Sequence, residues 1–153
     1  MSEQDRRVRY DVRMARRRQI VENAHGPEFR VILDESVINR PIGSAGIMAA
    51  QLESLVADAE RARVRIRVVP LKRSAEVGLA DAFQILNLSA DEDDGVVYRE
   101  WYDGDGIQLD PDDVRYYGRL FDDMWEISLP EEATIRAVTA EAMRLRSSLD
   151  RAI

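Results

Sequence analysis

The chain has 153 residues, 45% of them hydrophobic, which is enough for one domain with a real core. It has no cysteine and one histidine, which excludes disulfides, thiolate metal sites and cysteine nucleophiles and speaks against zinc. The net charge of −7 argues against nucleic-acid binding by bulk electrostatics. No apolar run approaches the roughly 18–20 residues of a bilayer span, so we expect a cytoplasmic protein.

The spacing of apolar residues in segment 2–24, together with its many arginines, predicts a basic helix. Segment 1–18 carries seven arginines against three acids, so it is positive within an acidic chain. We expect the helix to dock by a narrow apolar stripe, with its arginines either solvated or facing an acidic partner or phosphate. A breaker, His25-Gly26-Pro27, follows, and His25 is expected to be exposed. The stripe consists of Val8, Val12, Ala15, Gln19 and Ile20.

Residues 28–70 predict a βαβ unit, a strand followed by a helix and a second strand. The strands are 29–33 and 64–70, and the helix covers about 46–62 with Ser44 as N-cap. Arg65 and Arg67 alternate with apolar residues, and we expect them to pair with the ten acids of residues 91–113. The core-facing stripe of the helix is Ile47, Met48, Leu52, Leu55, Val56 and Ala59.

Segments 82–88 and 96–102 predict two strands that pair as a hairpin around an acidic turn. The following Asp103-Gly104-Asp105-Gly106 resembles the start of a calcium loop. Its twelfth position is Val114 rather than a glutamate, so we interpret it as a turn and expect no metal.

Two helices complete the chain. The first begins at the cap Asp110 with Pro111 at its first position and runs to about Ile127. The second is predicted to begin with a capping box of Ser128 and Glu131.

The predicted fold is α/β, leaning to α+β. It has a mixed sheet of four to five strands, built from the βαβ unit and the hairpin and packed by three to four helices. Two parts are expected, the basic helix 1–24 and a single domain 25–153.

The best positional argument for a site is the carboxyl end of the first strand. Asp34 and Glu35 stand there, and ligands bind at that edge in open α/β sheets, although the same acids could simply cap a helix. No phosphate-binding, dinucleotide, zinc-protease or nucleophile-elbow motif is present, so no cofactor is expected. If the protein is an enzyme, acid–base chemistry by Glu35, Glu100 and Tyr98 is what its residues allow. The expected ligand-binding residues are Asp34, Glu35, Arg40, Tyr98, Glu100 and Trp101.

One stretch, Leu33 to Gly43, is specific enough to suggest a family. Together with Met48–Leu52, Val68–Leu71 and Val97–Glu100, it resembles a domain of unknown function found after the XRE-type helix-turn-helix of actinobacterial regulators, including antitoxin-like ones. The resemblance covers about residues 14–150, and the helix-turn-helix itself is absent.

The resemblance implies the sensory or partner-binding half of a regulator, standing alone, and it does not carry over DNA binding. We expect a monomer or a homodimer. It transfers no catalytic residues. We expect this module to bind a small-molecule ligand or a protein partner. The alternative is an enzyme of small-molecule biosynthesis, such as secondary metabolism, that uses carboxylate acid–base chemistry without metal.

Overall fold

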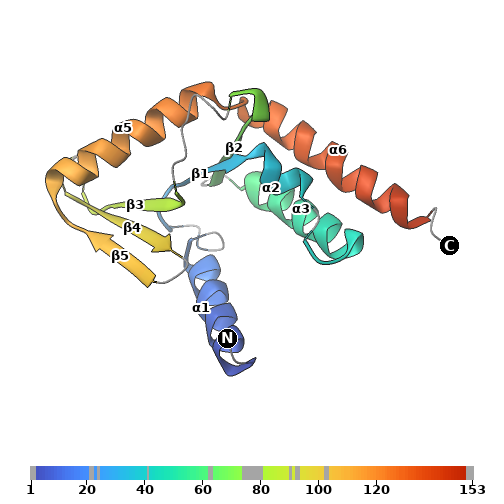
Figure 1. The fold of residues 1–153 in the computed structure, drawn as a ribbon, viewed down its shortest axis with the longest axis horizontal. Coiled ribbons are helices and arrows are strands. Elements are labelled where there is room, and N and C mark those ends of the chain that lie inside the picture. The colour runs from blue at the N-terminus through green and yellow to red at the C-terminus, as the bar shows by residue number, and fades with distance from the viewer. Residues whose placement is uncertain are drawn as a thin grey trace. The chain divides into compact units, whose positions relative to one another are not determined.

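The computed structural model describes residues 3–20, 23, 25–40, 42–61, 64–73, 81–89, 91, 94–101 and 104–150 (Figure 1). The chain divides into two compact units. The first unit is Met1–Val68 together with Leu129–Ile153, and the second is Val69–Ser128.

The first unit pairs a two-stranded sheet with helices. Strands β1 and β2 are neighbours in this sheet, and the chain between them forms two helices, which confirms the predicted strand–helix–strand order. Its elements are α1 (Glu3–Ile20), β1 (Phe29–Asp34), α2 (Glu35–Asn39), α3 (Ala45–Ala59), β2 (Val64–Val69) and α6 (Glu131–Asp150).

The core of the first unit lies where α2, α3 and α6 meet β2. Figure 1 shows α3 and α6 side by side, and their periodic apolar positions face each other. Ser44 caps α3 as predicted, because its hydroxyl accepts a hydrogen bond of 3.2 Å from the Ile47 N–H. The core residues are Ile38, Met48, Ala49, Leu52, Val68, Val138, Ala142 and Leu145.

Helix α1 joins the first unit through a charged contact. The Arg17 guanidinium donates hydrogen bonds of 2.7 and 3.3 Å to the two carboxylate oxygens of Asp58 on α3. Met14 and Arg17 are the half-buried positions of the helix. The predicted docking stripe is therefore wrong, because Val8 and Val12 lie on the opposite side of the helix from Arg17 and are exposed.

The second unit is an antiparallel sheet with one long helix across it. Strand β4 pairs with both β3 and β5, and Val97, at the centre, is completely buried. The Phe83 and Tyr117 rings lie 5.0 Å apart, which fixes α5 against one face of the sheet. The elements are η1 (Leu71–Arg73), β3 (Phe83–Asn87), β4 (Gly95–Trp101), β5 (Gly104–Gln108) and α5 (Pro111–Ile127).

The second unit begins and ends at one point of the first. The Leu129 N–H donates a hydrogen bond of 2.8 Å to the Val68 carbonyl. The Thr134 hydroxyl accepts from the Val68 N–H at 3.1 Å and donates to the Leu129 carbonyl at 3.3 Å. The two chain crossings between the units are thus tied together by three hydrogen bonds.

The mixture of helices and strands is confirmed, but the single mixed sheet of four to five strands is wrong. The described strands form two separate sheets, of two and three strands. The predicted turn at Asp103–Gly106 is also wrong from Gly104 on, because β5 begins there. Glycine and aspartate disfavour strands intrinsically, and here pairing with β4 overrides that preference.

Two predictions about helix positions are wrong as well. Ser128 does not open α6. Its hydroxyl donates a hydrogen bond of 2.7 Å to the Met124 carbonyl at the end of α5, and α6 begins at Glu131. Ile47 is exposed instead of facing the core, because it lies on the opposite side of α3 from the fully buried Ala49, two residues further on.

Candidate functional site

Three of the predicted site residues surround the short helix α2. Asp34 is its N-cap, and its carboxylate accepts a hydrogen bond of 2.8 Å from the Ser36 N–H. Glu35 follows as the first helical residue and is half-buried. Arg40 is the C-cap, with its N–H donating to the Ser36 carbonyl at 2.9 Å. The capping interpretation of Asp34 therefore holds.

The other three predicted residues belong to β4 in the second unit. Tyr98 is paired in register with Gln84 on one side and Ile107 on the other, and its side chain is half-buried. Glu100 and Trp101 are paired with Asp105 and Gly104, and their side chains lie outside the described part of the structure.

The predicted single sheet would have joined the strand that ends at Asp34 to the strand of Tyr98, but the described strands form two separate sheets. Asp34 ends β1 in the two-stranded sheet, whereas Tyr98 lies in the three-stranded sheet. The structure brings together Asp34, Glu35 and Arg40, and separately Tyr98, Glu100 and Trp101 as neighbours on one strand. The acid–base enzyme with Glu35, Glu100 and Tyr98 stays a prediction.

An exposed apolar surface covers the side of the second sheet that faces away from α5. Strand alternation and register place Leu86, Val96, Tyr98 and Ile107 on this side, and we call these four residues the outer sheet face. Ile107 is 67% exposed, and Leu86 is also exposed. Contiguous apolar surface of this kind marks binding sites in soluble proteins.

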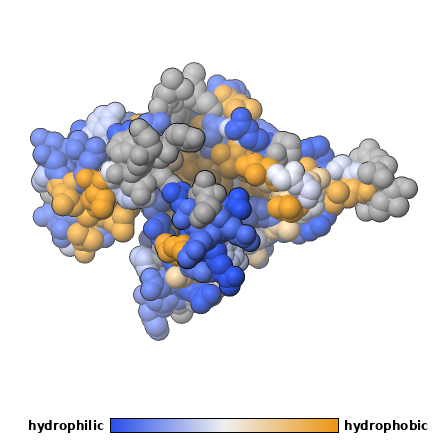
Figure 2. All heavy atoms as spheres, turned by 60° about the horizontal axis from the view of Figure 1, so that its bottom comes forward, coloured by the Kyte–Doolittle hydropathy of each residue, from blue (hydrophilic) through white to orange (hydrophobic). Residues whose placement is uncertain are grey.

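Exposed carboxylates lie at one end of the outer sheet face. Asp94 immediately precedes β4, and its carbonyl accepts a hydrogen bond of 2.9 Å from the Leu88 N–H. Asp110 follows β5, and the antiparallel register brings it to the same end of the sheet as Asp94. Figure 2 shows hydrophobic side chains among hydrophilic ones at the left of the view, on the surface that the second unit forms. The surface therefore combines apolar area with negative charge.

The two-stranded sheet carries a group of charged residues on the side away from its core. Arg65 donates hydrogen bonds of 2.9 and 2.7 Å to Glu131, and these bonds raise the pKa of Arg65. Glu131 also lies 3.7 Å from Arg67, and Glu28 lies 3.8 Å from Arg65. Pairing of these arginines with acids within the protein is as expected, but these two acids come from outside residues 91–113.

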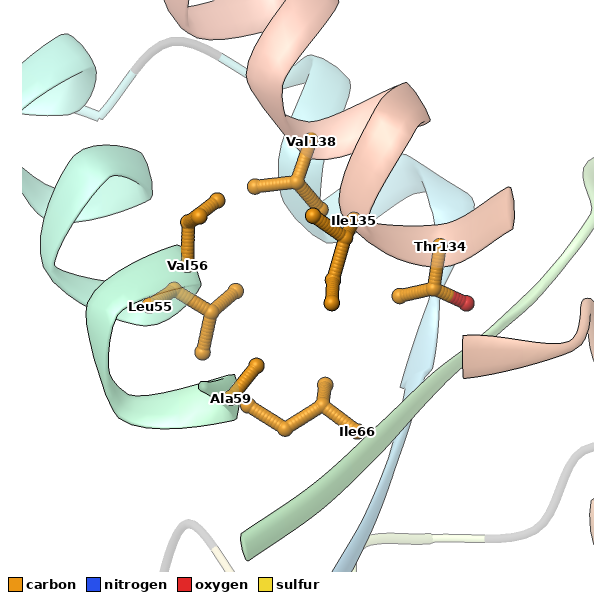
Figure 3. A pocket seen from close by; sticks show the side chains of 7 residues that line it. All are labelled: Leu55, Val56, Ala59, Ile66, Thr134, Ile135 and Val138. Carbon is orange, nitrogen blue, oxygen red and sulfur yellow. The ribbon is translucent and has the colours of Figure 1, made fainter. Parts of the chain in front are cut away.

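A second apolar surface follows the line where α3 packs on α6. At one end, Leu55, Ala59, Ile66 and Ile135 point toward a common space, as Figure 3 shows. Toward the other end, a groove of about 500 Å³ lies open between the helices and includes Val56 and Met143. We call the whole strip the α3/α6 groove.

Two classes of site are not found among the described residues. They contain no group of three or more histidines or carboxylates placed to hold a metal ion. Across the same part of the chain, no helix combines the length and the apolar character that crossing a membrane requires.

These features define an α+β protein built from two units with two open apolar surfaces. The chain belongs to the family described as domain of unknown function (DUF5753), whose profile matches residues 1–140. No curated protein and no solved structure was found to match it.

Neither apolar surface was predicted from the sequence. Only the outer sheet face has a sequence pattern from which it could have been predicted. Leu86 and Leu88, Val96 and Tyr98, and Ile107 and Leu109 are three apolar pairs at the two-residue spacing of a strand face. The α3/α6 groove gives no such signal, because Val56 belongs to the predicted core-facing stripe of α3 and Met143 is a single apolar residue on the polar side of α6.

Proposed function

We propose that the chain is a regulatory binding module that takes a protein partner on the outer sheet face. The single observation that carries this is an apolar sheet surface left open, with carboxylates at one end. Leu86 and Ile107 are exposed there, and a shallow apolar surface fits a protein better than a small molecule, which prefers a concave pocket.

The charge of the surface defines the partner's chemistry. Asp94 and Asp110 are both exposed at one end of the sheet, and Asp91 adds a third exposed carboxylate nearby in the chain. A segment with apolar side chains flanked by lysine or arginine complements this arrangement, and opposite charges at the rim accelerate association. Binding should therefore weaken as the salt concentration rises.

The regulatory part of the proposal is supported by the family resemblance. The resemblance implies that related domains stand next to DNA-binding modules in regulators, where a binding domain would report a partner or a ligand. A small-molecule ligand is the other occupant that this role allows, and the experiment separates the two.

Native mass spectrometry of the full chain, purified from its own host, tests the proposal. The wild-type protein should carry a bound polypeptide rich in lysine or arginine that is released by raised salt. Ile107→Glu should lose it, because the variant puts a charge at the centre of the surface. Met143→Glu is the matched control, since Met143 is 64% exposed against 67% for Ile107 and lies in the other unit.

Three outcomes contradict the protein-partner proposal. They are a wild-type protein with nothing bound, a polypeptide that Ile107→Glu retains, and a small molecule in place of a polypeptide. The last would assign the domain to ligand sensing.

A further inference from the structure

The α3/α6 groove lies along two antiparallel helices. Glu53 near the middle of α3 meets Arg146 near the end of α6, and Ala59 at the end of α3 shares a pocket with Ile135 near the start of α6. The inner sides of both helices form the core of the first unit. The groove is therefore the outer seam of a packed helix pair and has a rigid floor.

The groove exposes more apolar surface than a solvated helix pair needs. Met143 is 64% exposed, although it stands between the core positions Ala142 and Leu145 and is the one large apolar residue among the exposed positions of α6 that the structure describes. Val56 is half-buried and lines both the groove with Met143 and the pocket of Figure 3, where Ile135 is half-buried, so the two spaces are continuous along the seam. Covering this strip would remove apolar area from water.

The outer side of α6 carries an acid near its start, Glu132, and near its end Arg146, which is paired with Glu53 of α3. Glu132, Arg136, Thr139, Met143 and Arg146 follow one another at spacings of three and four residues, which places them on one side of the helix. Glu132 is 93% exposed, and its contact with Arg136 is long, at 3.8 Å. Arg146 lies almost four turns further on, about 21 Å along the axis.

Such a strip is complementary to itself. When two copies of α6 lie antiparallel with their Thr139 residues together, Glu132 of each copy comes opposite Arg146 of the other. A two-fold axis requires this property, because the same patch must supply both sides of the contact. Met143 of each copy then covers the apolar strip of the other, between the two charged ends.

We propose that a second copy of the chain occupies the α3/α6 groove, so that α3 and α6 of two copies form an antiparallel four-helix arrangement. Four-helix bundles bury such seams in this way. Two pairs of helices of this length can supply the roughly 1,200–2,000 Å² that a stable interface buries. The inference does not depend on the outer sheet face, which belongs to the other unit.

Sedimentation equilibrium of the full chain over a concentration series tests this contact. The wild-type chain should dimerise, and Met143→Glu should raise the dimer dissociation constant by more than about tenfold, since it places two charges near the axis. Ile107→Glu, equally exposed in the other unit, should dimerise like the wild type. A wild type that stays monomeric, or a dimer that Met143→Glu leaves unchanged, overturns the proposal.

A charge exchange shows whether the contact joins two copies in the stated orientation. Arg146→Glu should weaken the dimer, and Glu132→Arg added to Arg146→Glu should restore most of the loss. Glu132 and Arg146 are too far apart within one chain to compensate each other. Circular dichroism confirms that each variant is folded, and a double variant no tighter than Arg146→Glu refutes the antiparallel arrangement.

The two proposals fail separately. Loss of dimerisation in Met143→Glu leaves partner binding on the outer sheet face intact, and the reverse holds for Ile107→Glu. A chain that binds a partner and stays monomeric contradicts only the dimer.

Discussion

Thr134 is a single buried hydroxyl on which the junction of β2 and α6 depends. Its side chain is 1% exposed and bridges the Val68 N–H and the Leu129 carbonyl. Thr134→Val keeps the volume but leaves the Val68 N–H without its acceptor. We expect unfolding in urea to show a loss of about 1–3 kcal/mol, the cost of a buried unsatisfied group.

The control for Thr134 is the same change about one and a half turns further along the helix, at Thr139. Thr139 is half-buried on the groove side of α6, so Thr139→Val should change stability by less than about 0.5 kcal/mol. Equal losses in the two variants would mean that the hydroxyl bridge adds nothing.

Glu53 gives the first unit a predictable pH response. Hydrogen bonds of 2.8 and 2.7 Å from Arg146 lower the pKa of Glu53 below its ordinary value of 4.5. Because the folded pKa is the lower one, the pair stabilises the protein above about pH 4.5 and loses this effect as the pH falls through the folded pKa.

A carbon-detected NMR titration of the Glu53 carboxyl tests this response. Arg146→Gln should raise the pKa of Glu53 toward 4.5, since the hydrogen-bonding guanidinium is gone. Arg136→Gln, which removes the cation beside Glu132 instead, should leave it unchanged. The same Glu53 midpoint with and without Arg146 would show that the pair does not form in solution.

At the scale of elements, the contact of β4 with α5 leaves no room at Gly95. A Cβ built there would lie 2.8 Å from Val114 Cγ1 and 3.4 Å from the Leu86 carbonyl oxygen. We expect Gly95→Ala to destabilise the protein by about 1–3 kcal/mol, the usual cost of overpacking. Thermal unfolding followed by near-ultraviolet circular dichroism measures it through Tyr98, Tyr117 and the tryptophans.

Gly118 is the matched control within the same unit, and there we expect alanine to stabilise the protein instead of destabilising it. A Cβ there meets no heavy atom within 4 Å, and the position is in the interior of α5. Gly118→Ala should stabilise by about 0.5–1 kcal/mol through helix propensity. A neutral Gly95→Ala would mean that α5 does not pack on β4 as described.

Local signals in the sequence predicted the elements well and their tertiary roles less well. Ser44 and Asp110 mark helix starts because a side-chain oxygen that caps an N–H is a local matter. The prediction that Ser128 opens α6 was wrong because the same hydroxyl can instead bind the end of the preceding helix. Which helix it binds depends on the packing of both α5 and α6. Strand β5 was predicted as a turn because its glycines and aspartate do not favour a strand. Its pairing with β4 makes it one.

The candidate site depended on information that a single sequence does not contain. Asp34 and Glu35 were placed correctly at the end of β1, since that end follows from the strand itself. Their association with Tyr98 needed one sheet joining β1 to β4, and sheet membership is decided by pairing between distant segments. Open surfaces are harder still, because a single apolar residue such as Met143 on the polar side of a helix does not show by itself that a partner covers it.

At the scale of the whole molecule, the first unit should fold without the second. Its core residues all lie within Met1–Val68 and Leu129–Ile153. Replacing residues 70–127 by a linker of about four to six glycines and serines joins ends that are already within hydrogen-bonding distance. We expect the shortened chain to keep its helical circular dichroism and to unfold cooperatively in urea.

Thr134→Val in the shortened chain provides the control. Its destabilisation should match that in the full chain, because every partner of Thr134 is retained. A shortened chain with the circular dichroism of a random coil would show that the first unit needs the second in order to fold.

The hydrogen-bonded junction of Val68 and Leu129 also decides how the molecule would respond to stretching. Both described ends of the chain, α1 and α6, belong to the first unit. Residues 69–128 form a loop in the chain that is closed by the hydrogen bond between Leu129 and Val68. Tension applied through the ends therefore acts on the first unit. It reaches the second unit only after the hydrogen bond between Leu129 and Val68 breaks. In an optical trap, extension should come in two ordered steps, with the sixty-residue loop of Val69–Ser128 always released last.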